Sequence, residues 1–175
     1  KILSIGLVFF YTGISNAYTC DKKTAKKEVE RICSFIEKNG KLPDTETLFF
    51  NNCGINYAWI QGTDKKNKMQ FHPIQGHLTG KSLLKEVDSN GKKLFIDFHL
   101  EAHRVAKKYT TSDGEKIPKG KHNSGWVEYT WEKPGASKDT DKISYVKLCD
   151  GPKNVSWIVG SGIWKEDLEE YFLNK

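Results

Sequence analysis

The chain has 175 residues and a formal net charge of +6, a size that fits one domain able to bury a core without help from a metal. Lysines alternate with acidic residues along almost the whole sequence, whereas a nucleic-acid-binding protein usually concentrates its basic residues on one face or arm. The charge pattern therefore argues against a nucleic acid as partner.

The first 17 residues have the features of a secretory signal peptide. Lys1 precedes a stretch of apolar or small residues, 2–14, and small residues lead up to Ala17. The apolar run is shorter than the roughly 20 residues that a bilayer span needs, so we expect cleavage after Ala17. An uncleaved membrane anchor is the alternative. Residues 18–175 would then form one exported domain, periplasmic or secreted, with no membrane span after cleavage.

Four cysteines lie in the expected mature region, and they are Cys20, Cys33, Cys53 and Cys149. An even number in an oxidising compartment predicts two disulfides, with three pairings open. We favour Cys33–Cys53 with Cys20–Cys149, because Cys33 falls within a predicted helix and Cys53 just before the first predicted strand. The spacings match no redox pair, haem attachment or zinc site, so no cofactor is expected.

The first third of the chain predicts a helix followed by two strands. Apolar residues recur at helical spacing over residues 21–39, and Gly40 ends the pattern. Residues 55–61 and 68–72 are predicted to form two strands, with a turn that starts at residues 62–65 between them. The second strand is ended by Pro73, which lacks an amide donor.

The middle of the chain predicts two helices, at residues 80–87 and 92–108, followed by a polar loop over 109–124. His99 and His103 are spaced i, i+4 on the second helix and share a face, as a pair of metal ligands would. The motif of zinc proteases is absent and a third ligand is missing. Two solvent-facing histidines are therefore the favoured interpretation, and no metal site is expected.

The stretch from Gly125 to Trp164 predicts three consecutive antiparallel strands. Three runs rich in aromatic and β-branched residues are separated by Pro, Gly, Ser and Asp clusters. The third run contains Gly160 and Gly162, and glycines inside a strand mark a close approach of another group or a bulge. The order helix, two strands, helices and three strands indicates an α+β domain.

Patterns of enzymatic chemistry are missing from the sequence. There is no nucleophile elbow, no P-loop and no dinucleotide-binding glycine motif that opens a helix. Ser161 stands between two glycines, but its context is strand to strand rather than strand to helix. We therefore expect a protein that is not an enzyme.

The predicted meander does offer the elements of a ligand pocket. Aromatic walls come from Trp126, Tyr129, Trp131 and Tyr145, and a cation from Lys142. Tyrosine hydroxyls and a lysine suit a carboxylate, because charge-assisted hydrogen bonds are strong in a desolvated site. Strict alternation places Lys142 and Tyr145 on opposite faces, so both can line one pocket only with a bulge or twist. Packing of the tryptophans in the core is the alternative.

Five motifs occur in an order that resembles a known family. They are FHP (71–73), GKSLL (80–84), GWVEYTW (125–131), KISYV (142–146) and WIVGSGIW (157–164). From Lys22 to Tyr171 the chain is similar to single Cache (type 2) domains, the PAS-like extracytoplasmic sensor modules of bacterial chemoreceptors and histidine kinases. The resemblance implies a five- to six-stranded antiparallel PAS-like sheet with the long N-terminal helix on one face and shorter helices on the other.

The resemblance also implies a function, which is binding of a small organic acid such as a short-chain carboxylate. The implied ligand-binding residues are His72, Trp126, Tyr129, Lys142 and Tyr145, with Arg104 as an alternative partner of the carboxylate. The domain would act alone or present its ligand to a membrane receptor, and we expect it to stand alone rather than to be cut from a receptor. A Cache scaffold used only for protein interaction, without a small ligand, is the alternative.

Overall fold

The structure is a computed structural model. It describes residues 20–45, 48, 56–103 and 123–168, together with four two-residue strands between positions 105 and 121. The predicted signal peptide, Cys53 and Arg104 lie outside the described residues.

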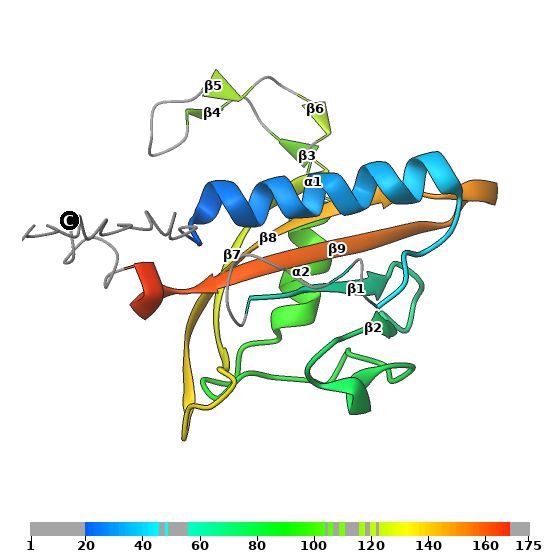
Figure 1. Ribbon diagram of the computed structural model, residues 1–175. Helices are drawn as coiled ribbons and strands as arrows, with labels where there is room; N and C mark the ends of the chain where they lie inside the picture. Colours follow the sequence, from blue (N-terminus) through cyan, green and yellow to red (C-terminus); the bar gives the residue numbers. More distant parts are fainter. Residues whose placement is uncertain are drawn as a thin grey trace, which may run out of the picture.

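A five-stranded antiparallel sheet forms the centre of the fold, with the strand order β2-β1-β9-β8-β7 (Figure 1). Its strands are β1 (Ala58–Gly62), β2 (Met69–Phe71), β7 (Ser124–Glu132), β8 (Asp139–Asp150) and β9 (Ser156–Trp164). The three antiparallel strands predicted over 125–164 are confirmed. Four further strands form two separate pairs, β3 with β6 and β4 with β5, and they are β3 (Val105–Ala106), β4 (Tyr109–Thr110), β5 (Lys116–Ile117) and β6 (Gly120–Lys121).

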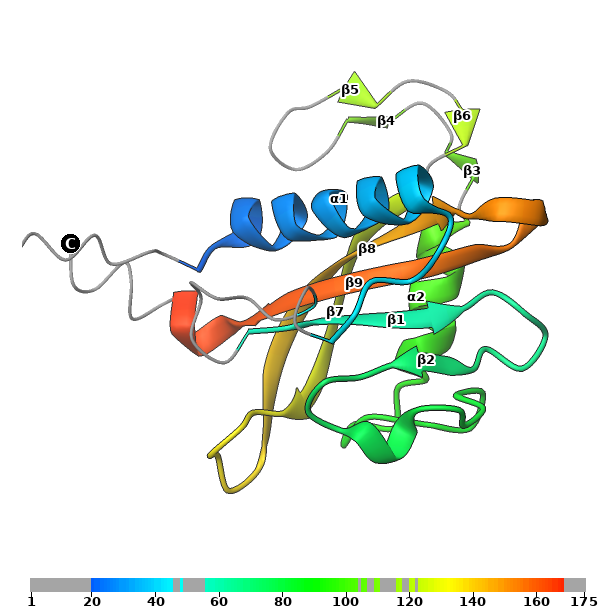
Figure 2. The same ribbon diagram turned by 45° about the vertical axis from the view of Figure 1, so that its right-hand side comes forward.

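The long N-terminal helix α1 (Lys22–Asn39) covers one face of the sheet and packs against β8 and β9 (Figures 1 and 2). Asp21 caps its start by accepting a hydrogen bond from the Thr24 amide at 2.7 Å. Gly40 ends it in the left-handed conformation, with φ of 64°, which glycine adopts without steric cost. The buried stripe of α1 consists of Ala25, Val29, Ile32, Cys33 and Ile36.

A disulfide between Cys33 and Cys149 joins α1 to β8, with the two Cα atoms 5.2 Å apart. The predicted pairing of Cys33 with Cys53 and of Cys20 with Cys149 is therefore wrong. Cys33 faces the sheet from the buried stripe of α1, and Cys149 lies in the same hydrophobic cluster under the helix. The two cysteines are 116 residues apart in the sequence, so their proximity could not be predicted from spacing. Cys20 is also disulfide-bonded.

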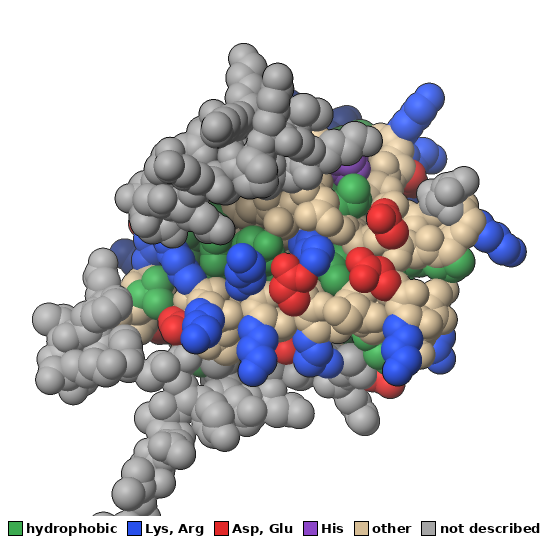
Figure 3. All heavy atoms as spheres, turned by 90° about the horizontal axis from the view of Figure 1, so that it is seen from above, with side chains coloured by type: hydrophobic (Ala, Val, Ile, Leu, Met, Phe, Trp, Pro, Cys, Tyr) green, Lys and Arg blue, Asp and Glu red, His purple; other side chains and the backbone are tan. Residues whose placement is uncertain are grey.

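The face of α1 that points away from the sheet carries charges of both signs. Figure 3 shows lysine and arginine side chains interspersed with acidic ones on this side of the molecule. Arg31 pairs with Glu28, and Lys147 of β8 pairs with Glu30. The mixture fits a solvated surface rather than a nucleic-acid-binding patch.

Helix α2 (Leu94–Ala102) covers the opposite face of the sheet, packing against β7 (Figure 2). It is shorter than the helix predicted over 92–108, because β3 begins at Val105. The helix predicted over 80–87 is wrong, since this segment forms turns and a single bridge between Lys68 and Ser82. Two short 3-10 helices, η2 (Gly76–Leu78) and η3 (Pro152–Asn154), lie in the connections between strands, and residues 165–168 form a helical turn after β9.

The two faces of the sheet hold two separate hydrophobic clusters. On the α1 side, Ala58, Ile60, Val159 and Cys149 pack under the helix. The α2 side is rich in aromatic residues, and its cluster includes Tyr57, Trp59, Phe95, Phe98, Tyr129 and Trp164. A Cβ atom on Gly160 would lie 2.2 Å from the Trp59 ring, so this glycine lets the ring lie against the strand.

Candidate functional site

One row of side chains crosses three strands on the α2 side of the sheet. Tyr129 of β7 lies directly opposite Lys142 of β8, which lies directly opposite Trp164 of β9. Directly opposed residues in an antiparallel sheet have Cβ atoms about 5 Å apart and point to the same face. The strand register therefore places a lysine between two aromatic side chains.

Lys142 is fully buried, with a relative exposure of 0%. Its Nζ atom lies 3.8 Å from the ring centroid of Trp164 and 4.0 Å from that of Tyr57. These aromatic faces attract a cation, but Nζ has no hydrogen-bond partner among the described residues. Removal from water lowers the pKa of Lys142 well below its ordinary value.

His72 follows the end of β2 and is buried beside Tyr57, with the two ring centroids 4.9 Å apart. Its Nδ1 atom accepts a hydrogen bond from the Gln75 amide at 2.8 Å, so in the neutral ring Nε2 carries the proton. Burial, followed by the positive charges of Lys142 and His77, lowers the pKa of His72 to about 3. The histidine is thus a neutral hydrogen-bond donor across the physiological pH range.

Tyr129 supplies a hydroxyl on the same face of the sheet. Its Oη atom lies 2.8 Å from Oγ of Ser144, and either atom can donate. Burial raises the pKa of Tyr129, as it does that of Tyr57, so both hydroxyls stay protonated. Lys142, His72 and the two tyrosines together provide one amino group, which is cationic when protonated, and three neutral donors.

A small cavity of about 10 Å³ lies between the sheet and α2. Its lining comes from both layers and is mainly aromatic: Tyr57, Trp59, His72, Leu94, Phe95, Phe98, Tyr129 and Trp131. A volume near 10–15 Å³ is about what one water molecule needs, and small-molecule sites usually enclose several hundred Å³. In this conformation the aromatic rings therefore fill most of the space between the layers.

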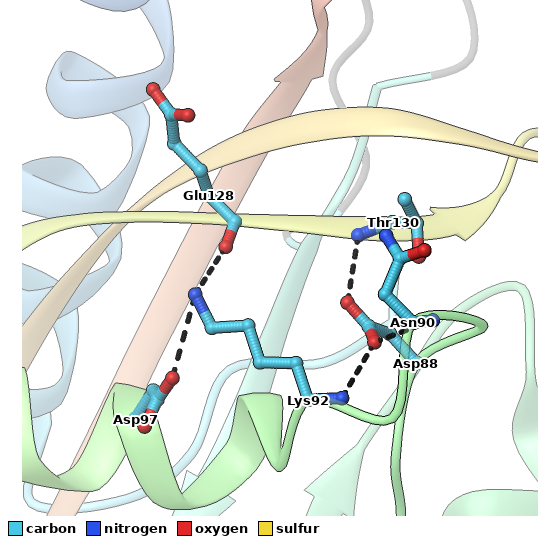
Figure 4. Close-up of polar contacts among 6 residues, drawn as sticks. All are labelled: Asp88, Asn90, Lys92, Asp97, Glu128 and Thr130. Atoms are coloured by element: carbon cyan, nitrogen blue, oxygen red, sulfur yellow. Dashed lines mark hydrogen bonds and ion pairs between the residues drawn. The ribbon is translucent and has the colours of Figure 1, made fainter.

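The loop 88–92 holds the wall formed by β7 in place (Figure 4). The Asp88 carboxylate accepts hydrogen bonds from the backbone amides of Asn90 at 3.0 Å, Lys92 at 2.8 Å and Thr130 at 3.0 Å. Burial opposes ionisation of Asp88, but these backbone hydrogen bonds outweigh it and lower the pKa. The Asp88 contact fixes β7 immediately after Tyr129.

Lys92 holds the same strand immediately before Tyr129. Its Nζ atom donates to the Glu128 carbonyl and lies 3.4 Å from the Asp97 carboxylate in the first turn of α2 (Figure 4). The loop thereby holds β7 on both sides of Tyr129, and Lys92 also connects it to α2. Residues 88–91 fall between the two helices predicted from the sequence and were assigned no role there, although an aspartate two residues before Asn-Gly is typical of a turn in which the side chain accepts backbone amides.

Two of the residues expected in the site lie on the other face of the sheet. Trp126 and Tyr145 pair directly across β7 and β8, with ring centroids 5.2 Å apart, and belong to the cluster under α1. The register between β7 and β8 runs without a shift, so no bulge brings Tyr145 to the side of Lys142. The structure thus brings together His72, Tyr129 and Lys142, and adds Tyr57 and Trp164, which sequence reasoning did not single out.

Metal ligands do not gather at this site. Among the described residues, no group of three or more His, Cys, Asp and Glu side chains is arranged to hold a metal ion. Nor does any helix in the described part of the chain have the length and apolar character of a membrane span.

Comparisons with known proteins give the family. The family model described as Cache domain matches residues 45–170, which is more than half of the chain. The methyl-accepting chemotaxis protein McpP of Pseudomonas putida (strain KT2440) is 25% identical over 167 residues, which is 95% of this chain and 24% of McpP. The chain thus spans about a quarter of the length of that relative.

Two solved structures share the fold. One is described as the periplasmic sensor domain of a chemotaxis protein, and it has a TM-score of 0.50 and 26% identity, with 81% of this chain and 88% of that chain covered. The other is a methyl-accepting chemotaxis protein from Vibrio parahaemolyticus RIMD 2210633, with a TM-score of 0.58, 18% identity and coverage of 84% and 90%. The chain therefore belongs to the Cache domain family, whose members are extracytoplasmic sensor modules of chemotaxis receptors rather than enzymes.

Proposed function

We propose that this Cache domain recognises a small organic acid whose carboxylate pairs with Lys142 on the α2 side of the sheet. The observation that carries the proposal is the complete burial of Lys142 without a hydrogen-bond partner among the described residues. Leaving a lysine in such a place is unfavourable, because burying an unpaired cation costs several kcal/mol or forces the group to lose its proton. An anionic ligand would supply the missing charge.

The neighbours of Lys142 suit a carboxylate in particular. His72 and Tyr129 both line the cavity, and each can donate a neutral hydrogen bond. Two donors and a cation match the lone pairs of the two carboxylate oxygens. The aromatic rings around them exclude water, which strengthens each of these interactions.

Binding requires the cavity to open, because about 10 Å³ does not hold even a two-carbon acid. Phe95 and Phe98 of α2 line the cavity opposite Tyr129, and they are the rings that we propose to move. A ligand that binds only the opened arrangement shifts the population toward it. Such a shift of α2 relative to the sheet would be the signal of the sensor.

A second function is supported by the same cavity. If the rings stay in place, the Cache scaffold holds no small ligand and acts as a protein-interaction module. Lys142 would then be held by Tyr57 and Trp164 alone, through cation–π contacts worth about 2 kcal/mol in a desolvated site. The small volume favours this alternative, whereas the unpaired Nζ atom favours the acid.

The proposal also covers the export of the domain and its partner. We propose that residues 1–17 direct export and are cleaved after Ala17, and that the domain reports its ligand to a membrane receptor. The name of the relative McpP, a methyl-accepting chemotaxis protein, supports a role in chemotaxis. Sequencing the N-terminus of the exported protein tests the cleavage position.

A thermal-shift screen of short mono- and dicarboxylates, with matching amides and amines as controls, tests the sensing function. A ligand that binds only the native state raises the melting temperature as its concentration exceeds Kd. We expect at least one acid to raise it in the wild-type protein and not in Lys142→Met, while the matching amide has no effect. Failure of every acid would favour the interaction module.

A further inference from the structure

Two histidines at the C-terminal end of α2 form an ordered pair outside the proposed acid site. The rings of His99 and His103 are stacked, with centroids 4.2 Å apart and planes inclined by 20°. The spacing of four residues places both on one face of the helix. His99 is half-buried and His103 is exposed, so the pair borders solvent.

The neighbours of His99 fix its tautomer. The side chain of buried Asn67 donates through Nδ2 to the Phe95 carbonyl at 3.3 Å, which leaves Oδ1 as the atom that faces His99. Oδ1 lies 3.1 Å from His99 Nδ1, and an amide oxygen can only accept. His99 Nδ1 must therefore carry the proton, and the lone pair of the neutral ring is on Nε2.

The tautomer of His103 follows by the same logic. Its Nδ1 atom lies 2.9 Å from the backbone carbonyl of His99, which is again an acceptor only. Nδ1 donates, and Nε2 holds the lone pair. Neither Nε2 atom has a hydrogen-bond partner in the part of the chain that the structure describes.

We propose that His99 and His103 bind one divalent transition-metal ion of the Zn²⁺, Ni²⁺ or Cu²⁺ class through their Nε2 atoms. Metal-bound histidines in proteins usually donate the other ring N–H to an oxygen acceptor, which orients the ring and makes the ligating nitrogen more basic. Both rings here donate Nδ1–H to an oxygen. Because a bound ion lies in the plane of each ring, the exposed His103 ring has to turn out of the stack to bring its Nε2 to the same ion as His99. Imidazole nitrogens suit these three ions, while Mg²⁺ and Ca²⁺ prefer oxygen ligands.

The histidines supply only two ligands from the described residues, so water or a small anion completes the coordination. Binding at this place would connect the last turn of α2 to its C-terminal cap, because His103 is the residue that caps the helix. The ion would thus stabilise the element that carries Phe95 and Phe98.

Isothermal titration of the untagged protein with Ni²⁺ and with Zn²⁺, with no organic acid present, tests the proposal. We expect one ion per chain, at least about a tenfold loss of affinity in His99→Gln and in His103→Gln, and no binding of Mg²⁺. His77→Gln is the matched control, since His77 is an exposed histidine on η2, and it should bind as the wild type does. Because His103 is exposed, its variant should fold normally.

Electron paramagnetic resonance of the Cu²⁺ complex gives a second readout, and two imidazole nitrogens should couple to the copper in the wild-type protein and one in His103→Gln. Unchanged affinity in His103→Gln, an equal loss in His77→Gln, or no ion bound by the wild type would each overturn the proposal. The experiment contains no carboxylic acid, so its outcome is independent of whether the domain senses one.

Discussion

Lys142 Nζ lies 3.8 Å from the ring centroid of Trp164, and the two residues are directly opposed across β8 and β9. An aromatic face stabilises a cation, yet it does not replace the hydrogen bonds that an ammonium group makes in water. The Trp164 ring therefore attracts the ammonium group of Lys142, while the N–H donors of that group have no hydrogen-bond acceptor among the described residues. Natural proteins retain such locally unfavourable groups mainly where function requires them.

Replacing Lys142 by methionine should stabilise the empty domain. Methionine keeps a similar length and removes the buried polar group, and replacements of buried charged groups by apolar residues often stabilise by about 1–4 kcal/mol. Urea denaturation should show a higher midpoint at pH 7 with an unchanged slope. A variant less stable than the wild type by more than about 1 kcal/mol would mean that the contacts with Tyr57 and Trp164 are Lys142's main role.

Binding of a carboxylate should take up protons. Desolvation lowers the pKa of Lys142 in the empty site, and a paired carboxylate raises it again. Between those two values the bound state holds more protons, so the affinity falls as the pH rises, by up to tenfold per pH unit. His72, with a pKa of about 3, and the tyrosines Tyr57 and Tyr129, with raised pKa values, do not titrate between pH 5 and 9.

Calorimetry of acid binding at one pH in phosphate and in Tris measures this uptake, because the two buffers differ in ionisation enthalpy. We expect uptake of up to one proton per ligand in the wild type. Lys142→Met should show none, if it binds at all. Equal apparent enthalpies in both buffers for the wild type would show that Lys142 is already charged in the empty site or is not the partner of the ligand.

Asp88→Asn should destabilise the domain through the loop that holds β7. The amide can keep one oxygen for the loop, but its NH₂ group would face the Thr130 amide in place of the carboxylate oxygen that accepts it at 3.0 Å. Leaving one buried donor unpaired costs about 1–3 kcal/mol. Because the native pKa of Asp88 is lowered, its contribution is present above about pH 4 and is lost as the pH falls through the native value.

Urea midpoints at pH 7 and at pH 3 measure the effect of Asp88→Asn, and the difference from wild type should be larger at pH 7. Asp97→Asn is the matched control, since its carboxylate is 39% exposed and lies 3.4 Å from Lys92. Exposed ion pairs contribute about 0–1 kcal/mol. Similar losses in the two variants would refute the special role of the buried carboxylate.

The period of two along the last three strands allowed much of the fold and part of the candidate site to be predicted. It assigned Tyr129 and Lys142 to defined positions in a meander, and it showed that Lys142 and Tyr145 point to opposite faces. It could not show which face holds the cavity, because both faces are buried and aromatic side chains fill cores and sites alike. Trp164 was therefore seen as part of a strand and not as a neighbour of the buried cation.

Other features depend on contacts between distant segments. The partner of Cys33 was predicted incorrectly because connectivity cannot be deduced from four cysteines alone. The apolar run within residues 80–87 is too short for its pattern to distinguish a helix from a loop. In the structure the segment is a loop, and of its two leucines only Leu83 is fully buried in the core. The tautomers of His99 and His103 depend on Asn67 and on a backbone carbonyl, which no spacing rule includes.

A comparison of two tyrosine variants tests which face of the sheet binds the acid. Tyr129→Phe removes a hydroxyl that lies on the side of Lys142, and Tyr145→Phe removes one on the side of α1. A hydrogen bond to a charged group is worth about 1.5–3 kcal/mol, so Tyr129→Phe should weaken binding about ten- to a hundredfold. Tyr145→Phe should bind as the wild type does. Titration of both variants with the best acid from the thermal-shift screen, together with urea midpoints to correct for the lost contact with Ser144, provides the measurement. Weaker binding in Tyr145→Phe with unchanged binding in Tyr129→Phe would move the acid site to the face covered by α1.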